Sequence, residues 1–175
     1  MDTSEFLGFL TNRASVREYG SDPVTDDEIQ YLLDCASTAP SAGNLEAWDV
    51  VLVTDEDARL ALQDAAYGQE HVGQAPLVIV ICANYIRSMS QYGERGILYA
   101  VQDATIACTY LMLAAHAQML HACWTGAFAE EEVRTMLGLP QHIRPVALLA
   151  VGRGTMPPSL TERMAVEEHV HYEKW

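Results

Sequence analysis

The stretch of residues 96–121 constrains the fold of this chain more than any other. It reads GILYAVQDATIACTYLMLAAHAQMLH, which predicts one long helix that is apolar on nearly every side and rich in alanine. Such a helix needs partners all round, in a protein core, at a subunit interface or in a membrane. Asp103 makes a membrane span costly, by roughly 2.5–3.5 kcal/mol or more. We therefore expect a central helix with strands and a second subunit around it, and no membrane.

The composition excludes disorder and argues against nucleic-acid binding. At 175 residues and 50% hydrophobic content, the chain is long enough for one domain with its own core. Its formal net charge of −14 is unsuited to nucleic acid, whose binding depends on clustered lysine and arginine. Lys174 is the one lysine, so any grouping of arginines calls for an explanation. A GC-rich genome and adaptation to salt both remain open as reasons for this bias.

The cysteines indicate a reducing compartment. They form no CxxC pair, and three of them lie in apolar runs, where a buried free thiol is the ordinary explanation: Cys35, Cys82, Cys108 and Cys123. The first 13 residues are acidic and amphipathic, so we expect no signal peptide and a cytoplasmic location. His169 and His171 have no third ligand nearby, so we expect no metal site.

Apolar runs, caps and chain breaks predict the remaining elements. Buried strands are expected at 48–54, 77–83 and 145–152, with a short strand or loop at 122–128. Short helices are expected at 5–11, 55–66 and 130–137, and another runs from the capping box at Thr25 and Glu28 to about Ser37. Residues 85–95 look polar and irregular, which indicates a mobile segment over a site.

Two stretches carry polar groups suited to a ligand. Arg13 and Arg17 flank Ser15, and guanidinium groups form forked hydrogen bonds to phosphate or carboxylate. Two solvated arginines, one paired with Glu18, are the alternative. The small polar loop at 39–44 either connects a helix to a strand or exposes N–H groups to a ligand. The chain has no GxGxxG, GxxxxGK or GxSxG motif, which favours a binding module or an enzyme whose chemistry belongs to a cofactor.

Five stretches occur in one order along the chain: RASVR at 13–17, APSAGN at 39–44 followed by Trp48, CWTG at 123–126, VG at 151–152 and VHYEKW at 170–175. Together they resemble the nitroreductase family. The resemblance runs nearly the full length and implies one domain over 1–175, of the α+β class, with a mixed sheet flanked by helices. It also implies an intertwined homodimer in which a C-terminal arm, 156–175, extends over the partner.

The resemblance further implies two FMN sites at the dimer interface. The implied contacts form three groups: Arg13, Ala14, Ser15 and Arg17 with Arg163; Pro40, Ser41 and Asn44 of the other subunit; and Thr125, Gly126 and Ala127. The first group would bind the phosphate, the ribityl chain and the pyrimidine end of the ring, with Arg163 completing the phosphate site. The third group would lie along the isoalloxazine, with backbone N–H groups near its N5.

The implied activity is that of an FMN-dependent oxidoreductase. It would pass hydride from NAD(P)H through FMN to a small electron-poor acceptor, such as a nitroaromatic or a quinone, by a ping-pong mechanism. The chemistry belongs to the FMN, so we expect no catalytic side chain. Two alternatives stay open: another flavin outcome, such as reductive dehalogenation or flavin destruction, and a flavin-binding protein without turnover.

The chain departs from the family pattern in two places. Family members commonly have glutamine and proline before the tryptophan, where this chain has Glu46 and Ala47 before Trp48. The usual glycine-tyrosine-proline after the third strand is Gly152-Arg153-Gly154 here. The sequence leaves the roles of Glu46 and Arg153 open, and with them the physiological acceptor and the choice between NADH and NADPH.

Overall fold

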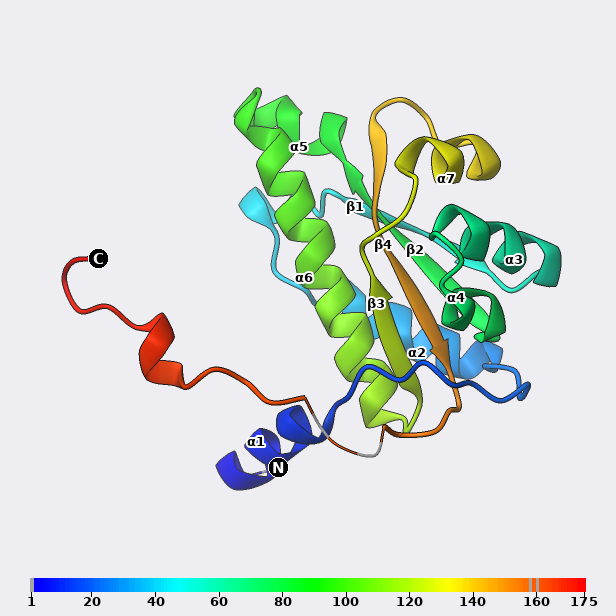
Figure 1. The fold of residues 1–175 in the computed structure, drawn as a ribbon. Coiled ribbons are helices and arrows are strands. Elements are labelled where there is room, and N and C mark those ends of the chain that lie inside the picture. Colours follow the sequence, from blue (N-terminus) through cyan, green and yellow to red (C-terminus); the bar gives the residue numbers. More distant parts are fainter. Residues whose placement is uncertain (1, 158, 160) are drawn as a thin grey trace.

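Four strands form one sheet in the order β1-β2-β4-β3, and helices cover both of its faces (Figure 1). The computed structural model describes residues 2–157, 159 and 161–175. The strands are β1 (Trp48–Val53), β2 (Leu77–Asn84), β3 (His121–Thr125) and β4 (Ile143–Gly152). The helices are α1 (Thr3–Asn12), α2 (Asp26–Ser37), α3 (Glu56–Ala65), α4 (Glu70–Gln74), α5 (Tyr85–Tyr92), α6 (Arg95–Ala117) and α7 (Glu130–Leu137), with short 3-10 turns η1 (Ala42–Asn44) and η2 (Val166–His169).

The α+β class and the long central helix are confirmed, whereas the mixed sheet is not. All three strand pairs are antiparallel. Within the described residues, parallel pairing is confined to an isolated bridge between Ser15 and Ala122. The segment around Ser15 makes one bridge rather than a ladder, so it adds no fifth strand.

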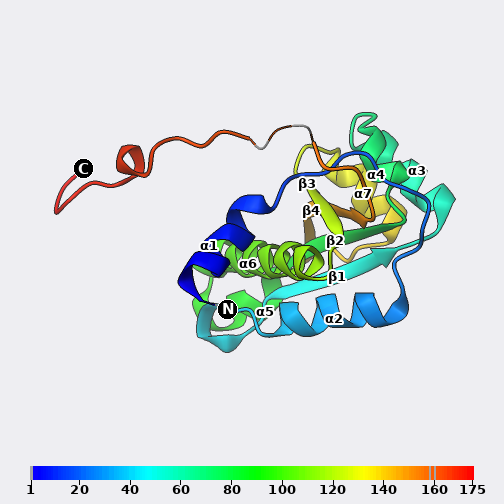
Figure 2. The same ribbon diagram turned by 90° about the horizontal axis from the view of Figure 1, so that it is seen from below.

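Strand β2 is buried on both faces, which explains its continuous apolar sequence. Leu77, Ile79 and Ile81 point toward α2 and α6 and join one core cluster. Val78 and Val80 point the opposite way and join a second cluster with side chains of α3, α4 and α7. The sheet therefore separates two cores, with α6 lying on one side and α3, α4 and α7 on the other (Figures 1 and 2).

Helix α6 is the expected central helix, although it ends four residues earlier than the sequence suggested. The Gln118 N–H closes the last turn on Ala114, and Met119 adopts a positive φ of 59° that turns the chain into β3. By length and composition alone α6 could cross a membrane. Here it lies along the sheet and contacts all four strands and α2, as the core helix of an α+β domain.

One local expectation was wrong, and one short helix was missed. Residues 85–95 were expected to be irregular, but most of them form α5, because the Asn84 side chain caps the helix by accepting the Arg87 N–H. Gly96 lets α6 cross α5 closely, since a Cβ there would lie 2.6 Å from the Met89 backbone nitrogen. The short helix α4 was not anticipated at all. The capping box at Thr25 and the cap at Asp55 are confirmed.

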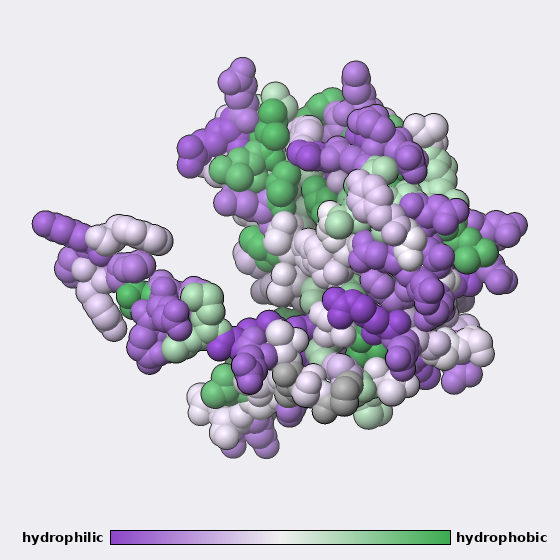
Figure 3. All heavy atoms as spheres, viewed as in Figure 1, coloured by the Kyte–Doolittle hydropathy of each residue, from purple (hydrophilic) through white to green (hydrophobic). Residues whose placement is uncertain are grey.

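The C-terminal segment reaches away from the rest of the molecule (Figures 1 and 2). Its described residues from 161 onward are exposed, including Trp175. Helix α1 has no buried residue. Figure 3 shows apolar side chains gathered over α5 and the first half of α6, where Ile86, Ile97 and Leu98 are exposed. These apolar surfaces have no cover within the described part of the chain.

Candidate active site

A hollow of about 350 Å³ brings the two ends of the chain together. We call it the arginine hollow, and its lining residues are Leu10, Thr11, Arg13, Ala14, Ser15, Thr161 and Arg163. Arg13 Nη1 is buried and has no hydrogen-bond partner in the described part of the structure. Buried polar groups are nearly always hydrogen-bonded, because an unmade bond there is expensive. The hollow is thus suited to an anionic ligand.

Arg17 lies beside the arginine hollow rather than in it. It lines a neighbouring hollow of about 380 Å³, which shares Ser15 with the first. Burial raises the pKa of the Cys123 thiol, while the charges of Arg17 and Arg13 both act to lower it. Both guanidinium groups therefore lie close enough to this one thiol to affect its pKa.

The other six arginines have protein partners, which distinguishes them from Arg13, Arg17 and Arg163. Arg59, Arg87, Arg134, Arg144 and Arg153 donate to carboxylates or backbone carbonyls, and Arg95 donates to the Tyr99 hydroxyl. Within the described residues, three arginine side chains make no hydrogen bond or ion pair: Arg13, Arg17 and Arg163. The alternative that one of them pairs with Glu18 is not what the structure shows. In a chain of net charge −14, two unpaired arginines in one hollow and a third in the hollow beside it indicate an anion site.

The loop that follows α2 lines a different and larger hollow, of about 550 Å³. Pro40, Ser41 and Ala42 form one wall, and α6 forms the other with residues that include Gln102 and Asp103. Asn44 is exposed at the tip of this loop and has a positive φ of 56°. Among the residues that the structure describes, the two hollows have no lining residue in common. One copy of the chain therefore does not bring Pro40 and Ser41 to the arginines.

The turn after β3 is held by side chains of α4 and of Gln69, the residue that precedes α4. His71 Nε2 lies 2.7 Å from Thr125 Oγ1, and the Gln69 side-chain amide donates to the Ala127 carbonyl at 3.0 Å. Burial lowers the pKa of His71, and the charge of Arg17 lowers it further. Gly126, between the two fastened positions, is exposed. Its backbone is therefore available to a ligand while its neighbours are fixed.

Gly126 lines a hollow of about 250 Å³ whose walls also include Arg144 and Val101. Val101 lines the larger hollow at Pro40 as well. The hollows at the turn after β3 and at the loop after α2 thus both reach Val101 of α6.

Comparison with known proteins supplies the family. A model of the nitroreductase family matches residues 10–72 and 63–153. The chain belongs to the nitroreductase family.

Relatives of this nitroreductase-family chain span most of its length. It is 34% identical over 168 residues to the NADH dehydrogenase of Thermus thermophilus, with 80% of this chain and 82% of that protein covered. It is 25% identical over 186 residues to the FMN reductase (NAD(P)H) of Bacillus subtilis, with 98% and 75% covered. The structure of the NADPH:FMN oxidoreductase from Vibrio harveyi complexed with NAD+ superposes with a TM-score of 0.89 at 23% identity, covering 97% of this chain and 77% of that one, and shows the shared fold.

The family resemblance named site residues that this structure only partly groups. Arg13, Ala14, Ser15 and Arg163 share the arginine hollow, with Arg17 adjacent. The other named residues lie elsewhere: Pro40 and Ser41 in the larger hollow, Gly126 in the smallest, and Asn44, Thr125 and Ala127 in none of these three. Their joint contact with one flavin needs the second subunit and stays a prediction.

Sequence reasoning missed three residues that hold segments of the candidate site. His71 and Gln69 fix the turn after β3, and Asp103 accepts hydrogen bonds from the loop after α2. Asp103 gave a signal, since an acid inside an apolar helix needs a partner when it is buried. His71 and Gln69 gave none, because their partners lie more than fifty residues away in sequence.

Proposed function

We propose that this nitroreductase-family chain is an FMN-dependent oxidoreductase that takes electrons from NAD(P)H and passes them to a small electron-poor acceptor by a ping-pong mechanism. Two observations carry the proposal: Arg13 lines a hollow together with Ser15 and Arg163, and its buried Nη1 has no partner among the described residues. A phosphate dianion would supply the missing acceptors through charge-assisted hydrogen bonds. The relative named as an FMN reductase adds support.

The residues present fit FMN better than a dinucleotide flavin. Arg13 and Arg163 would hold a terminal phosphate, Ser15 would bond the sugar-like chain, and Arg17 would reach the pyrimidine end of the ring. The sequence has no GxGxxG fingerprint of the kind that binds a dinucleotide pyrophosphate. Bound FMN would supply the two-electron transfer chemistry that no side chain here supplies.

The protein would hold and orient the ring rather than exchange protons with it. The exposed backbone of Gly126 would face the ring edge, fixed on both sides by the contacts of His71 and Gln69. Because the pKa of His71 is lowered by burial, this imidazole is neutral at pH 7 and serves to hold Thr125.

Two measurements on purified protein test the proposal. Flavin released by heat and separated by HPLC should be FMN, and a predominant FAD peak would contradict the assignment. Under anaerobic conditions, NADH or NADPH should bleach the yellow colour, and a quinone should restore it. Colour that resists both nucleotides would favour a flavin-binding protein without turnover. Colour that bleaches and never returns would favour flavin destruction.

We also propose that the chain is a homodimer. The exposed apolar side chains of α1, of α6 and of the C-terminal arm need a cover, which a second copy would supply. In that dimer the loop at Pro40 and Ser41 would reach the flavin held by the partner's arginine hollow, and the arm at 156–175 would lie on the partner.

Deletion of residues 156–175 tests the dimer. The truncated protein should lose both its dimeric state and its flavin, because Arg163 and the apolar arm leave together. Size-exclusion chromatography with light scattering, and the absorbance of bound flavin, give the two results. A truncated protein that stays dimeric and yellow would show that the arm is dispensable.

We further propose a cytoplasmic location. All four cysteines are free thiols, and burial raises the pKa of Cys82 to about 12. Free thiols persist where the compartment is reducing. Cell fractionation with an antibody to the protein tests this, and recovery outside the cytoplasmic fraction would contradict it.

A further inference from the structure

The loop after α2 has a backbone that needs outside support. Gly43 has a φ of 60°, and the non-glycine residues Asn44 and Glu46 have φ values of 56° and 48°. Residues with a Cβ avoid this left-handed region, and they stay in it only where surrounding contacts hold them. Two such residues and a glycine within four positions form an unusual loop, which we call the strained loop, residues 41–47.

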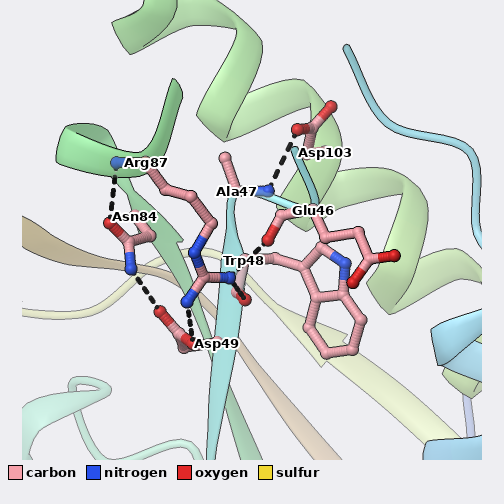
Figure 4. A network of polar contacts seen from close by, with 7 residues as sticks. All are labelled: Glu46, Ala47, Trp48, Asp49, Asn84, Arg87 and Asp103. Atoms are coloured by element: carbon pink, nitrogen blue, oxygen red, sulfur yellow. Dashed lines mark hydrogen bonds and ion pairs between the residues drawn. The ribbon is translucent and has the colours of Figure 1, made fainter. Parts of the chain in front are cut away.

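Asp103 holds both ends of the strained loop. Its side chain is buried in the middle of α6, at 2% exposed. Oδ1 accepts the Ala42 N–H at 2.9 Å and Oδ2 accepts the Ala47 N–H at 3.2 Å. The two amides bracket all three residues of positive φ. Figure 4 shows the carboxylate directed at Ala47 from the helix.

Arg87 holds the same loop from α5. Its guanidinium donates to the carbonyls of Glu46 and Trp48 and to the carboxylate of Asp49, which Asn84 also contacts (Figure 4). Arg87 and Asp49 therefore form an ion pair, with 2.9 Å between Nη2 and Oδ1. Asp103 has no basic partner among the described residues, so backbone N–H groups alone stabilise its charge.

We infer that Asp103 is a positioning residue for flavin binding: its carboxylate sets the conformation in which the strained loop presents Pro40, Ser41 and Asn44. The inference rests on the proposed function. Packing alone does not call for an acid at this position, because its buried neighbours on α6, Ala100, Ala104 and Ala107, fill the helix–sheet contact with alanine. Burying a carboxylate is unfavourable unless it is hydrogen-bonded, so the two loop amides explain its presence.

Asp103→Asn separates a positioning role from a structural one. Asparagine has nearly the same shape but replaces one acceptor oxygen by an NH₂ donor, so one of the two loop amides loses its partner. We expect faster hydrogen exchange at the amides of Ala42 or Ala47 in the apo-protein, measured by NMR. We also expect FMN titrated into this apo-protein to bind about tenfold more weakly, as for the loss of one charge-assisted hydrogen bond.

Val133→Ala is the matched control for general destabilisation. Val133 is fully buried in the other core, on α7, and contacts neither the loop nor the arginine hollow. This variant should unfold more easily yet keep wild-type exchange at Ala42 and Ala47 and wild-type affinity for FMN. An equal loss of FMN affinity in both variants would overturn the inference.

Three further results decide the matter. Unchanged exchange at both amides in Asp103→Asn would show that Asp103 does not hold the loop. Faster exchange with unchanged FMN affinity would show that the loop conformation does not serve the flavin. Either overturns the inference. If the wild-type protein itself does not bind FMN, the proposed function is contradicted. The titration of wild type, done before any variant is compared, gives that result.

Arg87→Met keeps the test open if Asp103→Asn does not fold. Arg87 is 40% exposed, so its loss leaves the core intact while it frees the carbonyls of Glu46 and Trp48. We expect faster exchange in the strained loop and FMN binding weakened roughly three- to tenfold. A loosened loop with wild-type FMN affinity would overturn the inference here too.

Discussion

The arginine hollow and the strained loop are built in opposite ways. In the hollow, Arg13 has a buried N–H group without an acceptor, and neither Arg163 nor Arg17 beside it forms an ion pair with the described residues. In the loop, Asp103 and Arg87 are hydrogen-bonded to the backbone around Glu46 and Ala47. The hollow therefore has donors that are free to bind a ligand, whereas the side chains that hold the loop already bind its backbone.

The difference indicates which part of the site the ligand completes. An unpartnered guanidinium lowers the stability of the empty protein and gains a partner only when an anion binds. A loop held in a left-handed conformation is shaped before the ligand arrives, so less ordering is needed on binding. Mutations in the hollow should therefore weaken ligand binding without destabilising the apo-protein, whereas mutations in the loop should lower stability as well.

The largest expected effect is at the arginines. Arg13→Ala or Arg163→Ala removes a charge-assisted hydrogen bond of roughly 1.5–3 kcal/mol, so FMN should bind about 10- to 100-fold more weakly. The double variant should fall short of additivity, because two arginines on one dianion are coupled. Apo-protein stability in Arg13→Ala should be no lower than that of wild type, measured by urea unfolding, because the variant removes a buried donor without an acceptor. A large loss of stability would mean that Arg13 is structural.

A pair of glycines tests the loop. Gly43→Ala forces alanine into a φ of 60° and places its Cβ 2.5 Å from the Tyr92 hydroxyl. Gly68→Ala, with a φ of 74° and open space around the Cβ, is the matched control. Each should destabilise the protein by about 1–2 kcal/mol from the backbone alone. Gly43→Ala alone should weaken FMN binding, severalfold in a titration of the apo-protein. Equal FMN affinities in the two variants would break the comparison between hollow and loop.

The smallest expected effect is at His71, whose pKa depends on the charge of Arg17. Burial and then Arg17 lower its pKa in the folded protein, whereas the unfolded chain titrates near the ordinary value of about 6.5. Below that pH the unfolded state binds a proton that the folded state resists, so the stability margin of wild type over His71→Gln should shrink as pH falls. NMR titration should show the pKa of His71 rising in Arg17→Ala and unchanged in Arg87→Met. A pKa insensitive to Arg17 would contradict this placement of the charge.

The sequence predicts well those features that depend on neighbouring residues. The capping box at Thr25, the alanine-rich α6 and the two-faced burial of β2 are all local patterns, and the structure has each of them. Helix α5 was missed because its cap, Asn84, is also the last residue of β2, so the helix begins directly after the strand with no separate connection between them. The antiparallel sheet was missed because strand direction depends on the path of the connections.

The candidate site, like the fold, was predictable only where it depends on neighbouring residues. Arg13 and Arg17 stand out in an acidic, lysine-poor sequence, and Arg163 joins them only through a contact between opposite ends of the chain. Asp103 holds a loop that precedes it by about sixty residues. No local pattern reveals such a contact. From the sequence, Asp103 was therefore recognised only as an acid within an apolar helix and not as part of a site.

The measurement that tests the central claim most directly compares FMN with riboflavin on wild-type apo-protein. The two ligands share the ring and ribityl chain and differ in the phosphate that the arginine hollow would hold. Calorimetric titration of both, in the same phosphate-free buffer, should give FMN at least about 100-fold tighter, as for two charge-assisted contacts. Equal affinities would contradict the account, because the unpartnered arginines would then have no part in binding the flavin.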